Sequence, residues 1–369
     1  MRVALVHDYL VQFGGAERVL MALMELFPNA PVFTLLYDPE RLRMPKPIDE
    51  SRIRTSFLQN IPGSRQHYRY FPVLMPLAVE QFNLKEYDLV LSATHSFGKG
   101  IIVGPNTLHI SYCFTPTRYV WDDSHRYVRD FSRSTLFQQF APLALSYIRT
   151  WDYYAAQRVT TYLTLSKYVA RRIQKYYHRS SQVIAPPVNI HRFKPEEANK
   201  GYYLVVSRLV QYKRIDIAIE ACERFGRPLK IVGSGPEEAI LKSLARKNTE
   251  FLGFVPDEKL PELYAGAKAL LFPQEEDFGI TPVEAAAAGK PTIAYRAGGA
   301  LETIQEHRTG MFFNEQTPES LMIALEQFET GDWDTKTIRR HAEKFDEALF
   351  IQRLQKIVDR EWQRFTMTI

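Results

Sequence analysis

The chain has 369 residues, of which 45% are hydrophobic and 24% charged, and its formal net charge is +5. These values exclude a disordered chain and predict two globular domains with full cores. The two cysteines, Cys113 and Cys222, lie in apolar stretches and are too few for a disulfide framework, so we expect reduced core thiols. No apolar run approaches the roughly eighteen residues of a membrane span, and the N-terminus lacks the apolar core of a signal peptide. We therefore expect no transmembrane helix and a cytoplasmic location.

Short apolar runs in the first half of the chain predict buried strands. They cover residues 2–7, 31–36, 88–93, 109–114, 160–166 and 182–185. Helical periodicity covers residues 16–27, where Val19, Leu23 and Phe27 share one face, and a longer stretch at 134–157.

The second half alternates more regularly between strand and helix patterns. Strands are predicted at 202–206, 229–232, 250–254, 269–272 and 292–295, and helices at 215–225, 237–246, 260–267 and 281–288. This alternation predicts a parallel sheet with helices on both faces. The join between the halves falls in residues 186–201, and residues 347–365 predict one amphipathic helix.

The predicted fold is therefore α/β, with two Rossmann-like parallel-sheet domains facing a central cleft. We expect an N-terminal domain at 1–190, a second domain at 191–345, and a C-terminal helix at 346–369 that can cross back to the first domain. Open α/β sheets bind ligands at the carboxyl ends of their strands, so the polar residues at those ends are the candidates for a site.

Glycines and cations follow several of these strands. Gly14 and Gly15 enter a helix and let the backbone approach a ligand closely, but the fingerprint G-x-G-x-x-G is absent, which argues against a nicotinamide enzyme. Arg208 and Lys213 follow the strand at 202–206 and suit a diphosphate; the alternative is that both are solvated surface cations. Gly233 opens a tight turn that either approaches a phosphate or is merely a turn.

The most informative run covers residues 274–291, where Glu276 and Glu284 stand eight positions apart. Thr281 is predicted to be the N-cap of a short helix, with Pro282 in its first position and Gly289 closing it. A loop carboxylate beside a helix N-terminus suits a sugar and its phosphate. The alternative is that Glu284 only completes a capping box and Glu276 is a solvated loop acid.

Taken together and in this order, these motifs resemble those of the family 4 retaining glycosyltransferases, which have the two-domain GT-B fold. The motifs are Gly14-Gly15-Ala16-Glu17, Arg208 with Lys213, the turn from Gly233 to Glu237, and the pair Glu276 and Glu284. Residues 109–122 resemble the branch that contains bacterial polysaccharide and O-antigen mannosyltransferases and related glucosyltransferases.

The resemblance implies roles for residues of the second domain. Arg208 and Lys213 would hold the donor diphosphate and offset charge on the leaving group. Glu284 would bind the nucleotide ribose and Glu276 the hydroxyls of the donor sugar. The backbone amides of Gly279 and Ile280 would meet the sugar or phosphate, and Val255 would lie near the base.

The resemblance also implies roles in the first domain. Gly14 and Gly15 would close on the diphosphate, and His95 could face the donor sugar as a catalytic residue, unless it is a surface loop histidine. Many relatives carry histidine before the Thr-Pro pair, where this chain has Phe114, and that departure puts the part of His95 in question.

The implied reaction is transfer of a sugar with retention, from a nucleotide diphosphate sugar to a glycan or a polyprenyl-diphosphate-linked acceptor. GDP-mannose is the first expectation for the donor and UDP-glucose the second. No cofactor and no metal are expected, because Arg, Lys and a helix end take the place of the metal. Two other classes stay open: a sugar-nucleotide 2-epimerase of the same fold, and a non-catalytic subunit that binds sugar nucleotides.

Basic residues and aromatic residues alternate between residues 118 and 179. The cations are Arg126, Arg129, Arg133, Arg149, Arg158, Lys167, Arg171, Arg172 and Lys175. This pattern is often a solvated face, but it also suits an anionic membrane surface. We therefore expect peripheral contact with the inner face of the plasma membrane, and no nucleic acid, since no nucleic-acid-binding motif is present.

Overall fold

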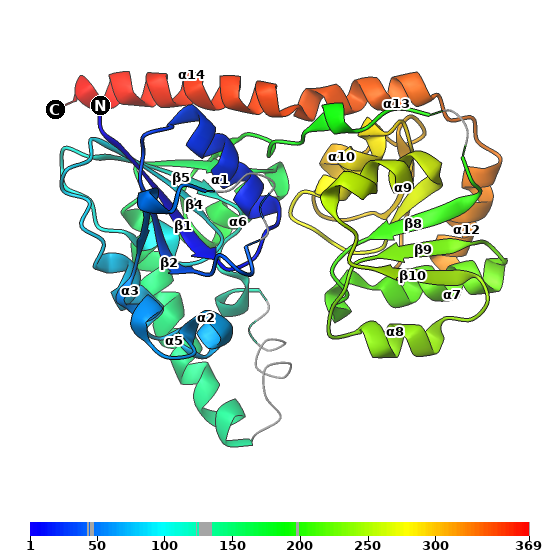
Figure 1. The fold of residues 1–369 in the computed structure, drawn as a ribbon, viewed down its shortest axis with the longest axis horizontal. Coiled ribbons are helices and arrows are strands. Elements are labelled where there is room, and N and C mark those ends of the chain that lie inside the picture. Colours follow the sequence, from blue (N-terminus) through cyan, green and yellow to red (C-terminus); the bar gives the residue numbers. More distant parts are fainter. Residues whose placement is uncertain (43, 45–47, 123, 125–134, 197–198, 369) are drawn as a thin grey trace. The chain divides into compact units, whose positions relative to one another are not determined.

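A computed structural model describes residues 1–42, 44, 48–122, 124, 135–196 and 199–368, without the side chains of 135–138. The chain forms two compact units (Figure 1). The first comprises Met1–Pro187 and Phe350–Ile369, and the second comprises Val188–Leu349. These divisions fall within a few residues of the boundaries expected at 190 and 345.

The first unit is built on a parallel sheet of seven strands in the order β3-β2-β1-β4-β5-β6-β7. The strands are β1 (Val3–Leu10), β2 (Val32–Tyr37), β3 (Ile53–Thr55), β4 (Leu89–Thr94), β5 (Leu108–Cys113), β6 (Thr161–Thr164) and β7 (Gln182–Val183). Its helices are α1 (Gly15–Leu26), α2 (Ser64–His67), α3 (Met75–Glu80), α5 (Thr135–Gln157), α6 (Lys167–Tyr177) and most of α14 (Glu347–Thr366). β4 and β5 are buried at every position, as expected for central strands covered on both faces.

The C-terminal helix returns to the first unit, as the sequence suggested. The ring of Phe350 packs edge-on against that of Tyr112, with centroids 5.8 Å apart. Further along α14, Glu361 accepts a hydrogen bond from the Thr161 hydroxyl at 3.1 Å. The helix is therefore part of the first unit's core although it ends the chain.

The second unit has a parallel sheet of six strands in the order β10-β9-β8-β11-β12-β13. The strands are β8 (Tyr202–Val206), β9 (Leu229–Val232), β10 (Thr249–Gly253), β11 (Ala267–Phe272), β12 (Thr292–Tyr295) and β13 (Gly310–Phe313). Its helices are α7 (Ile215–Phe225), α8 (Glu238–Leu244), α9 (Leu260–Gly266), α10 (Ile280–Ala287), α11 (Ala300–Thr303), α12 (Pro318–Glu329) and α13 (Thr335–Ala342). The expectation of two Rossmann-like parallel sheets is confirmed.

Each sheet has one point where the strand order reverses direction. In the first unit, β1 lies between β2 and β4; in the second, β8 lies between β9 and β11. The chain leaves neighbouring strands on opposite faces there, which opens a crevice at their carboxyl ends. Any site is therefore expected after β1 and β4, and after β8 and β11.

The structure also bears on the predictions about the two cysteines and about membrane-spanning helices. Cys113 and Cys222 are buried free thiols, so the prediction of reduced core thiols is confirmed, and burial raises the pKa of the Cys113 thiol to about 12. Within the part of the chain that the structure describes, no helix is long and apolar enough to cross a membrane.

Candidate active site

Two cations follow β8 at the carboxyl edge of the second unit's sheet. Arg208 comes just after the strand and is exposed. Lys213 lies in the short helical turn η7 (Gln211–Lys213), with its ammonium 5.0 Å from the centre of the Tyr212 ring. The side chain of Lys213 is only 14% exposed, and it forms an ion pair with Glu276.

Glu276 reaches Lys213 from the loop that follows β11, so the strand-order reversal brings two predicted site residues together. The backbone fixes this loop, because the Gly299 amide donates to the Glu276 carbonyl at 2.8 Å. A Cβ on Gly298 would lie 2.3 Å from that carbonyl oxygen, and one on Gly299 would lie 2.3 Å from Cα of Phe278. The two glycines therefore hold the Glu276 loop in place, a role not predicted from the sequence.

The helix after this loop begins two residues earlier than predicted. α10 starts at Ile280, and its N-cap is Gly279, at φ +92°, without a side-chain cap. The prediction of Thr281 as N-cap and Pro282 as first helical residue is therefore wrong. Gly279 adopts the left-handed conformation that admits the chain into the helix directly. The first amides of a helix lack intrahelical partners, so the start of α10 can offer the amides of Gly279 and Ile280 to an anion, and their part in donor binding stays a prediction.

Glu284 lies inside α10 rather than in its first turn, and it is 2% exposed. Its Oε2 accepts a hydrogen bond of 2.8 Å from the hydroxyl of Tyr264, a fully buried residue of α9. As the fifth helical residue, Glu284 stands too far along the helix for the reciprocal bond of a capping box. The capping alternative for Glu284 is therefore wrong. The hydroxyl of Tyr264, in α9, holds the Glu284 carboxylate in place.

The turn after β9, where Gly233 was predicted to bind the donor, packs against protein backbone. A Cβ on Gly233 would lie 1.9 Å from the Ser207 carbonyl oxygen, and one on Gly235 would lie 2.1 Å from that of Leu209. These contacts join the turn after β9 to the segment that carries Arg208. Val255 is half-buried and follows the exposed Phe254 at the end of β10, on the same carboxyl edge.

In the first unit, His95 follows β4 and meets a buried carboxylate. Its Nδ1 lies 3.1 Å from Oδ2 of Asp8, whose side chain is fully buried, whereas that of His95 is 46% exposed. Asp8 also accepts hydrogen bonds from the Thr94 hydroxyl and from the amides of His95, Ser96 and Gly98. Burial opposes ionisation of Asp8, but His95, His7 and the amides outweigh it and hold the pKa of this carboxyl below its ordinary value.

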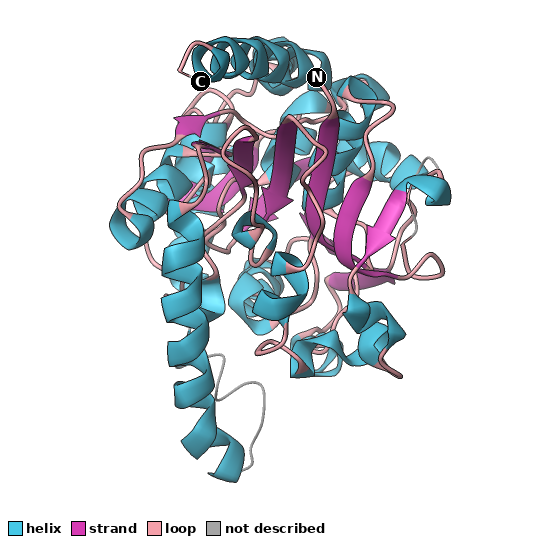
Figure 2. Cartoon of the chain, turned by 90° about the vertical axis from the view of Figure 1, so that its left-hand side faces the viewer, coloured by secondary structure: helices cyan, strands magenta, loops and turns pink. Residues whose placement is uncertain are grey.

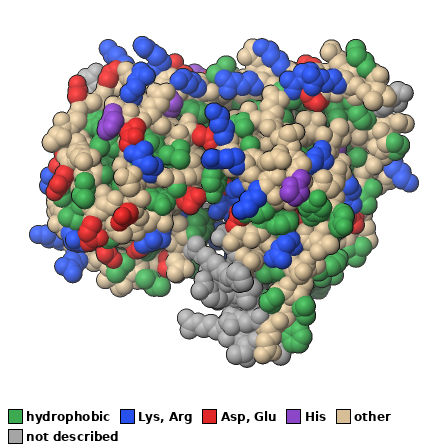
Figure 3. All heavy atoms as spheres, turned by 180° about the vertical axis from the view of Figure 1, so that it is seen from behind, with side chains coloured by type: hydrophobic (Ala, Val, Ile, Leu, Met, Phe, Trp, Pro, Cys, Tyr) green, Lys and Arg blue, Asp and Glu red, His purple; other side chains and the backbone are tan. Residues whose placement is uncertain are grey.

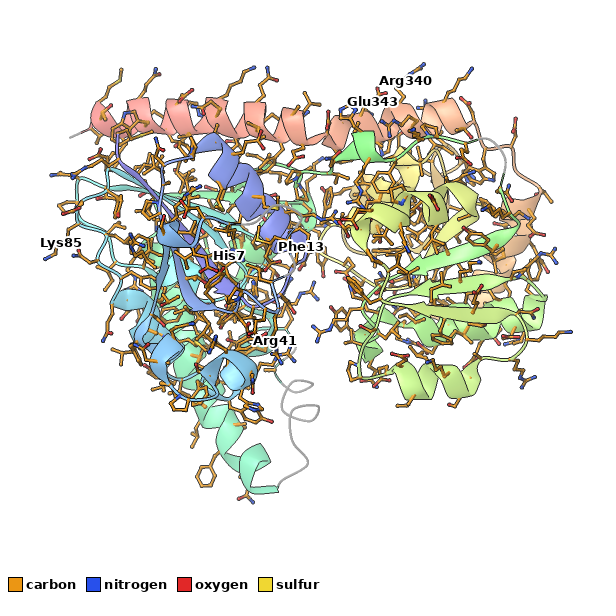
Figure 4. All side chains as sticks on the ribbon, in the orientation of Figure 1. His7, Phe13, Arg41, Lys85, Arg340 and Glu343 are labelled. Carbon is orange, nitrogen blue, oxygen red and sulfur yellow. The ribbon has the colours of Figure 1, made fainter. Side chains whose placement is uncertain are left out.

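A second buried pair lies beside the Gly14-Gly15 entry to α1. Nε2 of His7 lies 3.3 Å from Oε1 of Glu17 in the first turn of α1, and both side chains are buried. Figure 4 labels His7 within the sheet and Phe13 in the loop ahead of α1. Burial disfavours the charged imidazole, but the bond and charge of Glu17 raise the pKa of His7. Gly14, the N-cap of α1, is extended, and a Cβ there would lie 3.3 Å from Glu17.

A buried ion pair supports the loop that carries His95. Nζ of Lys99 lies 2.5 Å from Oδ1 of Asp152, and neither side chain is exposed by more than 1%. Asp152 also accepts from the hydroxyls of Thr117 and Tyr177 and from the indole of Trp121. Such a fully paired network fixes the loops after β4 and β5 relative to α5 and α6.

Phe114 and Asp122 lie in the segment that follows β5. Phe114 is 8% exposed and packs edge-on against Tyr112, so it is part of the core. Asp122 pairs with Arg172 and Tyr176, while Asp123 lies outside the described residues. Among the residues that are described, no group of three or more His, Cys, Asp or Glu side chains could hold a metal ion.

Asp8 and Tyr264 are the residues that sequence reasoning missed. Asp8 has a recognisable signal, because an acid that continues an apolar buried strand must find partners inside the protein. Tyr264 has no such signal in the sequence, because a tyrosine in a short amphipathic helix is commonly a core residue.

The fold is that of the two-domain glycosyltransferases known as GT-B. It matches sucrose-phosphate synthase from Thermosynechococcus elongatus with a TM-score of 0.75 at 16% identity, over 99% of this chain and 100% of that one. It also matches Anabaena HepE in complex with UDP-glucose, with a TM-score of 0.68 at 17% identity, over 98% and 100% of the two chains.

Residues 188–347 match the glycosyl transferases group 1 family, and the chain therefore carries a domain of that family. A GDP-mannose-dependent phosphatidylinositol monomannoside mannosyltransferase of Mycobacterium tuberculosis is 31% identical over 40% of this chain and 46% of its own length. O-antigen chain mannosyltransferase B of Escherichia coli is 27% identical over 72% of this chain and 78% of its own. The chain thus spans less than half the length of the mycobacterial relative.

Proposed function

We propose that the protein transfers a sugar, with retention, from a nucleotide diphosphate sugar to a glycan or lipid-linked acceptor in bacterial surface polysaccharide synthesis. The observation that carries the proposal is the ion pair of Lys213 with Glu276 at the reversal point of the second sheet. The pair lies in the loops after β8 and β11; Arg208 follows β8 as well, and α10 begins shortly after Glu276. This cation-rich crevice lies within the domain that matches the glycosyl transferases.

Each part of this crevice has a task in the proposed reaction. The bond between the anomeric carbon and the diphosphate breaks, so positive charge develops on the sugar and negative charge on the leaving group. Arg208, Lys213 and the N-terminus of α10 stabilise the diphosphate. Glu276 binds sugar hydroxyls while holding Lys213, and Glu284 accepts the ribose hydroxyls in an orientation set by Tyr264.

We assign the acceptor to the first unit, and we propose that two of its glycines contribute to donor binding. Gly14 and Gly15 approach the diphosphate, supported by the buried pair of His7 and Glu17. In His95, the Nδ1 proton faces Asp8, which leaves Nε2 as the nitrogen that meets the substrate.

Mannose is the first candidate for the sugar and glucose the second. The mycobacterial relative is GDP-mannose-dependent and the Escherichia coli relative is a mannosyltransferase, which supports GDP-mannose, whereas the UDP-glucose complex of HepE supports UDP-glucose. The proposed acceptor is a glycan chain or a polyprenyl-diphosphate-linked sugar, met in the cytoplasm. We also propose that no metal takes part, so transfer should persist in excess chelator; loss of activity that magnesium or manganese restores would contradict this.

A thermal-shift panel of sugar nucleotides, followed by turnover assays with and without acceptor, tests the proposal. A ligand at 100 times its dissociation constant adds about 2.7 kcal/mol of stability. Acceptor-dependent release of the nucleoside diphosphate supports transfer. Conversion of the sugar nucleotide without acceptor would point to a 2-epimerase instead, and binding without any turnover would point to a non-catalytic subunit.

A further inference from the structure

Exposed hydrophobic side chains gather in two segments of the first unit. Of the seventeen large hydrophobic residues found exposed among the described residues, eight belong to these segments. They are Tyr70, Val73, Leu74 and Leu77 in and before α3, and Phe140, Leu143, Tyr147 and Tyr154 on α5. Scattered exposed side chains need no explanation, but a contiguous cluster marks a surface that meets a protein or a membrane.

The four residues on α5 form one stripe. Their spacings of three, four and seven residues place them on the same side of the helix. They are exposed by 60% (Phe140), 68% (Leu143), 52% (Tyr147) and 67% (Tyr154), whereas Leu145 and Ile148 on the other side are buried. The stripe is therefore not the packing face of α5. The helix extends beyond the sheet of this unit (Figure 2).

Glu80 connects α3 to this stripe. Its Oε1 accepts hydrogen bonds from the Trp151 indole at 2.8 Å and from Arg158 at 2.7 Å, both on α5. Glu80, Tyr147, Trp151, Tyr154 and Arg158 are among the residues that line a cavity of about 500 Å³. Leu77 stands three residues before Glu80 and so lies on the same side of α3. We call these two segments the α3–α5 surface.

The charges around the α3–α5 surface are mostly positive. No acid occurs between Glu50 and Glu80, while Arg65 and Arg69 are exposed just before Tyr70. On the described part of α5 the one acid, Asp152, is buried against Lys99, and Glu80 is neutralised by Arg158. In Figure 3, hydrophobic side chains (green) and basic side chains (blue) lie in the lower right of the molecule, over this unit.

Six of the nine cations expected to face a membrane are described; Lys167, Arg171 and Lys175 are exposed, whereas the other three bond to groups of the protein. Arg126, Arg129 and Arg133 lie outside the described residues. Arg149 donates to the Val120 carbonyl, Arg158 pairs with Glu80, and Arg172 pairs with Asp122. A membrane contact should therefore be sought where apolar side chains are exposed, and not at these cations.

We propose that the α3–α5 surface docks on an anionic lipid bilayer. Its leucines and aromatic rings enter the interface between headgroups and acyl chains, where tyrosine is stable with its ring in the apolar layer and its hydroxyl in water. Arg65 and Arg69 lie against the anionic headgroups. The docking deepens the proposed function, since it would present the enzyme to an acceptor carried on a lipid, but it needs neither donor nor catalysis.

Sedimentation with vesicles tests the proposal on the full chain. The wild type should bind vesicles that contain phosphatidylglycerol at low salt, and bind pure phosphatidylcholine weakly. Leu77→Glu and Leu143→Glu should each reduce partitioning about tenfold or more. Arg65→Gln and Arg69→Gln should each reduce it about fivefold, and high salt should remove their effect. Because these four side chains are exposed, the variants should fold, which circular dichroism and the melting temperature will show.

Ile240→Glu and Ile323→Glu are matched controls, since both residues are 57% exposed on the second unit and should leave vesicle binding unchanged. Equal, negligible binding to all vesicles would overturn the proposal. So would concentration-dependent dimerisation that Leu143→Glu abolishes, which would assign the surface to a second copy of the chain, or saturable binding of soluble glycans that Tyr147→Ala abolishes. Donor binding measured in the same variants keeps a failure of docking distinct from a failure of the proposed transfer.

Discussion

At the scale of single residues, the two carboxylates of the second unit should have different effects when neutralised. Glu276→Gln removes the ion-pair partner of Lys213 and the proposed ligand of the sugar hydroxyls, so kcat should fall at least tenfold while nucleoside diphosphate affinity changes little. Glu284→Gln should instead weaken nucleotide binding. Steady-state kinetics together with calorimetric titration separate the two effects, and the same change in both variants would contradict the division of roles.

The hydroxyl of Tyr264 should act through Glu284. Tyr264→Phe removes one hydrogen bond to that carboxylate and should raise the nucleotide dissociation constant about fivefold, for a bond worth about 1 kcal/mol. Tyr203→Phe is the matched control, because its buried hydroxyl bonds to Glu329 at 3.1 Å and should affect stability alone. If both variants bind nucleotide as the wild type does, Tyr264 has only a packing role.

At the scale of elements, the C-terminal end of α10 agrees with the prediction from the sequence, whereas its N-terminal end does not. Gly289 follows the helix at φ +72°, and the amides of Gly289 and Lys290 donate to the carbonyls of Ala286 and Ala285, the hydrogen-bond pattern of a Schellman motif. The prediction that Gly289 closes the helix is thus confirmed. A Cβ at this position would lie 2.4 Å from Cγ2 of Thr335.

Gly289→Ala should therefore destabilise the protein by about 1 kcal/mol or more. Thr281→Ala should change stability by less than about 0.5 kcal/mol, because Thr281 is not the N-cap. Urea unfolding of the two variants measures the difference. A loss near 1 kcal/mol in Thr281→Ala would restore the capping role that the sequence suggested.

Elements with long apolar runs or clear helical periods could be predicted from the sequence, and those fixed by tertiary contacts could not. The bounds of β8, β9 and β12 agree with the prediction, because each is a short buried run between turn residues. β3 was missed because Ile53-Arg54-Thr55 has one buried position at a sheet edge, and β13 because it begins with a glycine. In the site, the sequence indicated Lys213 and Glu276 but not their ion pair, since that contact depends on strand order.

At the scale of the whole molecule, stability should depend on pH through Glu329. Hydrogen bonds from Arg227, together with Lys268 and Tyr203, outweigh burial and lower the pKa of Glu329 to about 2. A folded-state pKa below the ordinary 4.5 stabilises the protein above pH 4.5, and this contribution is lost as the pH falls from 4.5 towards 2. Glu329→Gln should therefore lose stability at pH 6 and show a weaker decline below pH 4.5 than the wild type.

Urea unfolding between pH 6 and pH 3 tests this dependence. Glu326→Gln is the control, because Glu326 is exposed on the same helix and should leave the pH profile unchanged. Parallel profiles for the wild type and Glu329→Gln would show that the cluster around Glu329 contributes no pH dependence.

The central claim is that the carboxyl edge of the second sheet binds a nucleoside diphosphate through its cations. The most direct measurement is calorimetric titration of the full chain with GDP and with UDP, in the wild type, in Arg208→Ala and in Arg246→Ala. Arg246 is also exposed, but it precedes β10 and so lies at the amino edge of the sheet. The account predicts that the wild type binds at least one of the two and that Arg208→Ala weakens binding about tenfold or more, whereas Arg246→Ala does not. Wild-type affinity in Arg208→Ala, or no binding of either nucleotide by the wild type, would contradict it.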